Sequence, residues 1–317
     1  MSFKILGTGS SLPALRVTND DLSKKVDTSD EWIVSKTGIK ERRILSSESL
    51  TDIATDACVK ALESANAKIE DIDLIICATT LGDMYIPSMA CLVAEKLGAK
   101  VPSFDVNAAC SGFVYALDVA AGYFARKKVK KVLVVSAEQL SKHVNWQDRT
   151  TCVLFGDGAA AVVLGEGNNL LAIRLTCVPD STALYANYTG GVSPFDTREK
   201  LSPYINMNGQ AVYRFAVNAA CNDLTAVIKE ANLNENDISH ILLHQANMRI
   251  IDAAIAHIKI PKDKFINSID RTGNVSAVSI PLLLDEANKA KKFKKGDLLA
   301  ISAFGAGLTT GACVIRW

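Results

Sequence analysis

The segment Asn107-Ala-Ala-Cys110-Ser-Gly places a cysteine immediately before a long apolar stretch, residues 111–125, in which Asp118 is the only charged residue. A stretch that is apolar on nearly every side indicates a buried helix. The unpaired N–H groups and positive dipole end at the start of such a helix favour a thiolate, which is the nucleophilic form of cysteine. We therefore expect a lowered thiol pKa and nucleophilic chemistry at Cys110. The alternative is a cysteine that only fills the core.

Three further motifs place polar or small groups beside apolar runs. His244-Gln-Ala-Asn247 follows the run 241–243, Gly273-Asn274-Val-Ser276 precedes an apolar stretch, and Phe304-Gly305 ends another run. A glycine at such a position lets the backbone approach a ligand, and its N–H can bind an oxyanion. Each motif also has a plain structural explanation: a hydrogen-bonded histidine, a helix cap and an ordinary turn.

An internal repeat relates the two ends of the chain. Residues 65–76 align without a gap to residues 231–242, an offset of 166, and the same offset carries 132–137 onto 298–303. Two matches at one offset predict a duplicated unit, with an N-terminal half over 1–168 and a C-terminal half over 169–317. The offset carries Cys110 onto Ser276, so we expect the two helix starts to meet near a pseudo-twofold axis. Two unrelated units of similar composition remain the alternative.

Each half alternates helical patterns with short, continuous apolar runs such as 74–78 and 132–135. Continuous runs are typical of strands covered on both faces, which predicts an α/β fold with mostly parallel sheets between helices. Two such sheets would give stacked layers of helix and sheet. Residues 178–208 show little periodicity, and we expect a long connection there that covers a site.

Composition excludes several classes of protein. The 317 residues carry a formal charge of +1, which excludes a strongly basic nucleic-acid binder, and no apolar run is long enough to span a bilayer. None of the eight cysteines form a C-x-x-C pair, so no zinc-ribbon spacing is present. With no recognisable signal peptide, we expect a reducing, cytoplasmic location and no membrane association.

Together these motifs resemble the thiolase-like condensing enzymes, and most closely the 3-oxoacyl-[acyl-carrier-protein] synthase III family. The resemblance covers essentially the whole chain. It implies a five-layer α-β-α-β-α fold and a Cys-His-Asn triad of Cys110, His244 and Asn274. The motifs that carry it are Thr28-Ser-Asp-Glu-Trp32-Ile, Thr37-Gly-Ile, Asn107-Ala-Ala-Cys110-Ser-Gly-Phe, Phe155-Gly-Asp-Gly-Ala, His244-Gln-Ala-Asn247, Arg249-Ile, Gly273-Asn274-Val-Ser276 and Phe304-Gly305-Ala-Gly307.

The resemblance also implies binding residues. Those for coenzyme A are Thr28, Trp32, Lys36, Arg149 and Asn247. Arg249 and Arg214 resemble a docking patch for the acidic acyl carrier protein, and Ile86 an acyl-pocket residue that crosses a homodimer interface. Lys36 stands where some relatives have Arg, Ile86 where some have Phe, and Gly307-Leu-Thr-Thr-Gly311 departs from the family's usual Gly-Phe-Thr-Trp-Gly.

The implied reaction joins an acyl-CoA primer, expected to be acetyl-CoA, to malonyl-[acyl-carrier protein] with loss of CO2, and it initiates type II fatty-acid synthesis. Cys110 forms the acyl-enzyme, the N–H groups of Cys110 and Gly305 bind the oxyanion, and no metal or other cofactor is needed. Three alternatives stay open: a cysteine hydrolase, a related acyltransferase of secondary metabolism, and a binding protein on a catalytic fold that has lost its activity.

Overall fold

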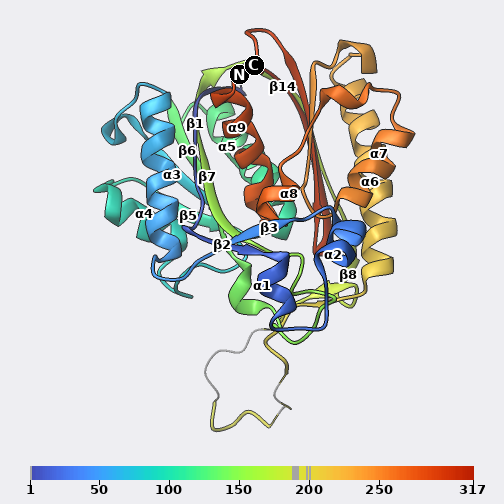
Figure 1. Ribbon diagram of the computed structural model, residues 1–317. Coiled ribbons are helices and arrows are strands. Elements are labelled where there is room, and N and C mark those ends of the chain that lie inside the picture. Colours follow the sequence, from blue (N-terminus) through green and yellow to red (C-terminus); the bar gives the residue numbers. More distant parts are fainter. Residues whose placement is uncertain (1, 188–192, 198, 200) are drawn as a thin grey trace.

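The computed structural model describes residues 2–187, 193–197, 199 and 201–317. Two five-stranded sheets and three helical layers alternate across the molecule, as Figure 1 shows. Within these ranges no helix has both the length and the apolar character needed to cross a bilayer. The alternation of sheets and helical layers confirms the predicted five-layer arrangement in outline.

The first sheet has the strand order β1-β7-β6-β4-β5. Strands β4, β5 and β6 run parallel to one another, while β7 is antiparallel to both β6 and β1. The elements of this half are β1 (Ser2–Ser11), α3 (Leu50–Ser64), β4 (Leu74–Ala78), α4 (Met89–Leu97), β5 (Ser103–Val106), α5 (Gly112–Ala125), β6 (Lys131–Gln139) and β7 (Asp157–Gly167).

The second sheet repeats this plan, with the order β12-β11-β13-β14-β8. Strands β11, β12 and β13 are parallel, and β14 is antiparallel to β13 and β8. Its elements are β8 (Leu170–Asp180), α6 (Gly209–Glu230), β11 (His240–Leu243), α7 (Met248–His257), β12 (Phe265–Ile266), α9 (Ser279–Lys289), β13 (Leu298–Gly305) and β14 (Gly307–Arg316). The predicted boundary at 168/169 lies between β7 and β8; the division into two domains stays a prediction.

Three apolar clusters hold the layers together. Helices α5 and α9 lie between the sheets, where Phe113 and Leu283 share one core with residues of both sheets. Helices α3 and α4 cover the outer face of the first sheet, and α6 and α7 cover the outer face of the second. Burying apolar surface stabilises a fold by about 25 cal/mol per Å². Because both faces of each sheet are covered, side chains on both faces of a strand gain from being apolar, which explains the continuous apolar runs.

The two halves share the same strand order, but the gapless offset taken from the sequence holds only for β4 and β11 and fails for β6 and β13. Leu74 pairs with Val132 in the first sheet, whereas His240 pairs with Leu299 in the second, so the strand after β11 is displaced by one residue. Val132 and Leu299 both face the central helices. A one-residue slip in a strand turns every side chain to the opposite face, so the structural offset here is 167.

Smaller elements cover the edge at which the strands β6 and β13 end. They are β2 (Leu15–Thr18), α1 (Asn19–Ser23), α2 (Asp30–Thr37), β3 (Glu41–Ile44), the short pair β9 (Leu184–Tyr185) and β10 (Asn206–Met207), and α8 (Ile269–Thr272). Helix α2 ends at Gly38, whose φ of 76° is in the left-handed region that glycine adopts without strain. Part of the predicted connection 178–208 lies outside the described residues.

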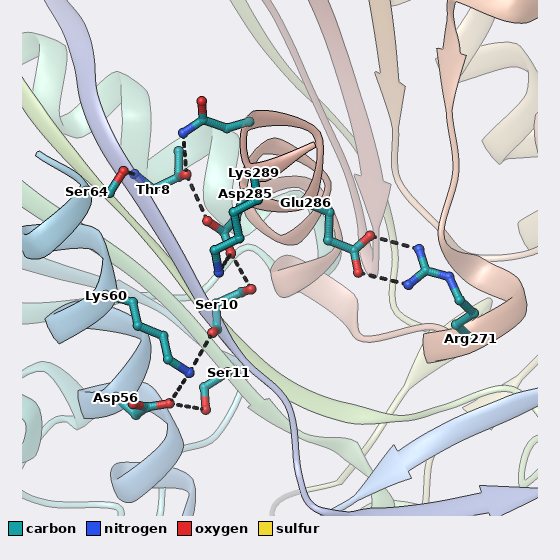
Figure 2. A network of polar contacts seen from close by, with 11 residues as sticks. Thr8, Ser10, Ser11, Asp56, Lys60, Ser64, Arg271, Asp285, Glu286 and Lys289 are labelled. Carbon is teal, nitrogen blue, oxygen red and sulfur yellow. Dashed lines mark hydrogen bonds and ion pairs between the residues drawn. The ribbon is translucent and has the colours of Figure 1, made fainter. Parts of the chain in front are cut away.

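A buried carboxylate ties the central layer to the first sheet. Asp285 on α9 is fully buried and accepts hydrogen bonds from Thr8 (2.9 Å), Ser10 and Lys289 (2.7 Å). Figure 2 shows this network beside the more exposed pair of Asp56 and Lys60 on α3. A buried charge is tolerated only when donors satisfy it, so Asp285 sets the position of α9 against β1.

We expect Asp285→Ala to lower the free energy of unfolding by about 1–3 kcal/mol, because it leaves the buried hydroxyl of Thr8 without its acceptor. Asp56→Ala is the matched control from the same network; its carboxylate is half-exposed, and we expect a loss of only about 0–1 kcal/mol. Urea unfolding measures both. Equal losses for the two variants would contradict the role given to Asp285.

Candidate active site

Cys110 lies in a one-turn 3-10 helix, Ala109–Ser111, that connects β5 to α5. Ala109 has a φ of 46°, an uncommon value for a residue with a side chain, and this bend places Cys110 at the beginning of the buried helix. Burial raises the pKa of the Cys110 thiol to about 12, against a lowering by its hydrogen bond with Ser276. The expected lowering of this pKa is therefore wrong, because loss of solvation outweighs the effect of the helix start.

His244 follows the last residue of β11, as predicted, and is almost fully buried. Its backbone N–H donates to the Ser302 carbonyl (2.9 Å), and its ring packs edge-on against Phe304 at 5.1 Å between centroids. Burial lowers the pKa of His244 to about 3, so the imidazole is neutral near pH 7. Among the residues that the structure describes, none forms a hydrogen bond with its Nδ1. The neighbouring Gln245, which is also buried, holds this turn by accepting from the backbone of Ser268 (3.0 Å).

Asn274 is held by backbone bonds to a segment of the other half. Its N–H donates to the Leu154 carbonyl (2.8 Å), and its carbonyl accepts from Gly156 (3.0 Å). The side-chain Oδ1 accepts from the Ser276 N–H (2.9 Å). Because Oδ1 is occupied in this way, the Asn274 Nδ2 group remains a donor for a molecule in the pocket.

Gly305 lies against the backbone of Cys110. A Cβ atom at position 305 would come within 2.6 Å of the Cys110 nitrogen. Only glycine allows the two backbones to approach so closely, and an oxyanion site made of backbone N–H groups requires such an approach. The structure therefore supplies a steric reason for the glycine that the sequence motif indicated.

One cavity of about 590 Å³ joins these groups to the surface. Cys110, His244, Asn274 and Gly305 all contribute to its wall, so the structure brings together residues that lie up to 195 positions apart. Further out, the wall contains five of the predicted binding residues: Trp32, Lys36, Arg149, Asn247 and Arg249.

The mouth of the cavity combines cations with aromatic rings. The Arg149 guanidinium lies 5.2 Å from the centre of the Trp32 ring and donates to the backbone carbonyl of Asp27 (2.8 Å). Arg249 lies 5.8 Å from the ring of Tyr213. Asn247 has a structural role as well, since its side chain caps α7 and donates to the Lys36 carbonyl (3.1 Å).

Three predicted residues lie outside the walls of this cavity. Thr28 precedes α2, and its hydroxyl is buried without a hydrogen-bond partner. Arg214 is exposed on α6. Ile86 is 86% exposed on the loop before α4 and lines neither this cavity nor the second cavity beside Cys110. The roles given to these three residues stay predictions.

A second cavity of about 360 Å³ lies on the other side of Cys110. Its wall includes Thr80, Tyr85, Asn107, Phe155 and the described residues 184–187 of the long connection. The sequence identified the connection as a cover but gave no signal for Thr80 or Tyr85, because their contribution depends on how the loop before α4 folds back. Ser276 also lines this cavity.

The geometry is suited to acyl transfer. It offers a partly buried thiol, a close approach of two backbone segments, a neutral imidazole and a carboxamide with a donor group, all beside one channel. Such an arrangement can bind an acyl group covalently and can stabilise negative charge on a thioester oxygen. In a Cys-His-Asn hydrolase the Asn orients the His; here Asn274 Oδ1 binds Ser276 and His244 Nδ1 is unpartnered, which disfavours that alternative.

Comparison with known proteins agrees with this chemistry. The model of 3-oxoacyl-[acyl-carrier-protein (ACP)] synthase III matches residues 104–178, and the model of that enzyme's C-terminal part matches residues 228–317. Beta-ketoacyl-[acyl-carrier-protein] synthase III of Clostridium acetobutylicum is 46% identical, with 100% of this chain and 99% of the relative covered.

Solved structures give the same result. The crystal structure of 3-oxoacyl-[acyl-carrier-protein] synthase III from Aquifex aeolicus VF5 has a TM-score of 0.93 at 45% identity, covering 99% of this chain and 100% of that one. A priming beta-ketosynthase from the R1128 polyketide biosynthetic pathway has a TM-score of 0.92 at 29% identity, covering 99% and 96%. The resemblance inferred from the sequence motifs is confirmed: this chain belongs to the 3-oxoacyl-[acyl-carrier-protein] synthase III family, with its thiolase-like fold.

Proposed function

We propose that this chain catalyses the decarboxylating Claisen condensation of an acyl-CoA primer, acetyl-CoA, with malonyl-[acyl-carrier protein], and so initiates type II fatty-acid biosynthesis. The observation that carries this proposal is the shared cavity of Cys110, His244, Asn274 and Gly305 in a chain of this family. The 46% identity to the synthase III of Clostridium acetobutylicum, against 29% to the polyketide priming enzyme, favours primary over secondary metabolism.

In the first half-reaction the Cys110 sulfur attacks the thioester carbonyl of the acyl-CoA. Negative charge develops on the carbonyl oxygen, and the N–H groups of Cys110 and Gly305 bind that oxygen; the close approach of the two backbones supports this assignment. CoA then leaves, and the acyl group remains on Cys110. The 360 Å³ cavity on the far side of the sulfur gives the acyl chain a place to lie.

In the second half-reaction the malonyl group loses CO2 and becomes an enolate. His244 and Asn274 stabilise the enolate oxygen, each with one hydrogen bond. The neutral state of His244 suits this role, because a neutral imidazole donates one hydrogen bond without adding a full charge to the pocket. The enolate carbon attacks the acyl group, and 3-oxoacyl-[acyl-carrier protein] is released.

The cavity mouth binds the phosphate-bearing parts of both substrates. Arg149 and Lys36 interact with the CoA phosphates, and Trp32 stacks on the adenine. Arg249, with the exposed Arg214, receives the acidic carrier protein. Thr28 and Asn247 complete the CoA site. No metal or redox cofactor takes part in this reaction.

The enzyme works as a homodimer in the cytoplasm. Met84, Tyr85 and Ile86 expose about half or more of their surfaces on one loop, an unfavourable arrangement for a free surface. In the dimer Ile86 would close the partner's acyl pocket, and its size would help to set the length of the primer.

Intact mass spectrometry after incubation with a panel of acyl-CoAs tests the covalent step. We expect the mass of one acyl group to be added to the protein, with acetyl-CoA giving the fastest gain. Cys110→Ala should gain no mass, whereas Cys177→Ala, which removes an exposed thiol away from the cavity, should behave as the parent protein. An unmodified parent protein would contradict the proposed mechanism.

Asn274→Ala should slow decarboxylation of malonyl-[acyl-carrier protein] by about 10²–10³-fold, because it removes one of two donors to the enolate oxygen. The rate at which Cys110 is acylated should change much less, since Asn274 acts in the second step. Release of labelled CO2 measures the first effect and mass spectrometry the second. Equal losses in both steps would show that Asn274 acts as part of the general scaffold.

A further inference from the structure

A carboxylate that the proposed reaction does not use lies close to Cys110. Glu138, near the end of β6, is completely buried. One of its oxygens accepts from the backbone N–H (3.1 Å) and the hydroxyl (2.5 Å) of Thr80. The other accepts from the hydroxyl of Ser276 (2.9 Å). A buried carboxylate is costly to keep charged, and these hydroxyl and amide donors offset part of that cost.

Ser276 connects this carboxylate to the reacting sulfur. Its hydroxyl donates to Glu138, and the same side chain lies near the Cys110 thiol, whose pKa it lowers. Both Cys110 and Ser276 line the 360 Å³ cavity, so the bridge lies at the site of acylation. The backbone bond from Ser276 N–H to Asn274 Oδ1 and the φ of 50° at Ser276 hold this hydroxyl in place.

We propose that Glu138 accepts the thiol proton of Cys110 through the Ser276 hydroxyl as the acyl-enzyme forms. The inference rests on the proposed function, because it assigns the proton transfer of that first half-reaction. Ser276 touches the reacting sulfur, while Glu138 acts only through Ser276.

The proton movements balance along this path. As the sulfur attacks, the thiol proton passes to Ser276 Oγ and the original hydroxyl proton passes to Glu138 Oε1. The new S–C bond forms, the tetrahedral intermediate collapses, and the C–S bond to CoA breaks. The proton then returns through Ser276 to the departing CoA thiolate, which restores the Glu138 carboxylate and leaves acyl-Cys110.

Electrostatics favour this path over direct loss of the proton. Ionised Glu138 raises the pKa of Cys110, so a thiolate and a carboxylate are unfavourable side by side. The relay moves one negative charge from Glu138 to the sulfur and never creates two. His244 is a weak alternative acceptor, because burial lowers its pKa to about 3.

Burial raises the pKa of Glu138 to about 7, against the lowering by its bonds from Thr80 and Ser276. Above that pH Glu138 is ionised and can accept a proton; below it the group is already protonated and cannot. Acylation should therefore become faster as the pH rises through about 7.

Few other titratable groups face this site from the surrounding elements. Cys77 on β4 is coupled to Glu138, but burial raises the pKa of this thiol well above the neutral range. His143 lines the same cavity, and burial lowers its pKa. Asp157 on β7 pairs with Gln139, the residue after Glu138, so its side chain points to the opposite face of the sheet. The pH step assigned to Glu138 is therefore distinct from the titration of these groups.

The test measures how fast Cys110 reacts between about pH 5.5 and 9, with acetyl-CoA in the absence of malonyl-[acyl-carrier protein] and, separately, with iodoacetamide. We expect the parent protein to show a rise centred near pH 7 in both reactions. Glu138→Gln should lose this rise and acylate about 10²–10³-fold more slowly at pH 8. The amide can still accept from Thr80 and donate to Ser276, so the pocket keeps its hydrogen bonds.

Ser276→Ala removes the bridge, and with it one donor to Glu138, while the carboxylate itself and its bonds from Thr80 remain. It should also lose the rise, and the double variant should be no slower than the slower single variant, because both changes interrupt one path. Asp157→Asn is the matched control: it removes a buried carboxylate from the same sheet but should keep the rise near pH 7. Thermal unfolding of each variant separates loss of the relay from loss of folded protein.

The outcomes discriminate clearly. A pH step retained in Glu138→Gln, or losses that multiply in the double variant, would overturn the relay. Failure of the parent protein to gain an acyl group from any acyl-CoA would instead count against the proposed function, and the iodoacetamide profiles would still test the relay on its own.

Discussion

The packing of two apolar helices between two sheets is the constraint on which the rest of this structure depends. Helices α5 and α9 are covered by a sheet on each side. Their first turns therefore pack against each other and against the ends of β6 and β13. Gly112 at the start of α5 would bring a Cβ within 3.5 Å of Ala277 in the other half. Contacts this close bring the Cys110 turn and the Ser276 turn together.

Burial that holds the site together also sets its acid–base chemistry. The same exclusion of water raises the pKa of the Cys110 thiol and the Glu138 carboxyl and lowers the pKa of the His244 imidazole. A neutral imidazole is a good hydrogen-bond donor to an enolate. A thiol shielded from water is a poor nucleophile until another group accepts its proton. A nearby acceptor such as Glu138 meets that need without opening the pocket to solvent.

Backbone geometry contributes as much to the site as side chains do. Ala109 and Ser276 both have φ values near 50°, and both begin the one-turn helices that lead into α5 and α9. The gapless repeat had matched Cys110 with Ser276; the backbone instead matches Ala109 with Ser276 and Cys110 with Ala277. The serine is thus free to contact the cysteine from the opposite turn, where it bridges to Glu138.

Local sequence determined the alternation of helix and strand, the burial of α5 and the positions of Cys110, His244, Asn274 and Gly305 at the ends of elements, because apolar periodicity and small or polar residues act over a few positions. It also showed the repeat, since the two halves still share residues on equivalent elements. The local sequence could not predict the register of β13. A strand buried on both faces has no polar side, so nothing in its pattern marks which residues point toward the central helices.

Only the tertiary structure decided how these groups act on one another. Glu138 has no distinguishing neighbour in the sequence, yet strand pairing and the turn at Ser276 place it one hydrogen bond from a serine that lies near the reactive sulfur. Thr28, Arg214 and Ile86 lie outside the shared cavity for the same reason, since the direction of a side chain depends on how distant segments pack. Protonation states follow from burial, and burial is a property of the whole fold.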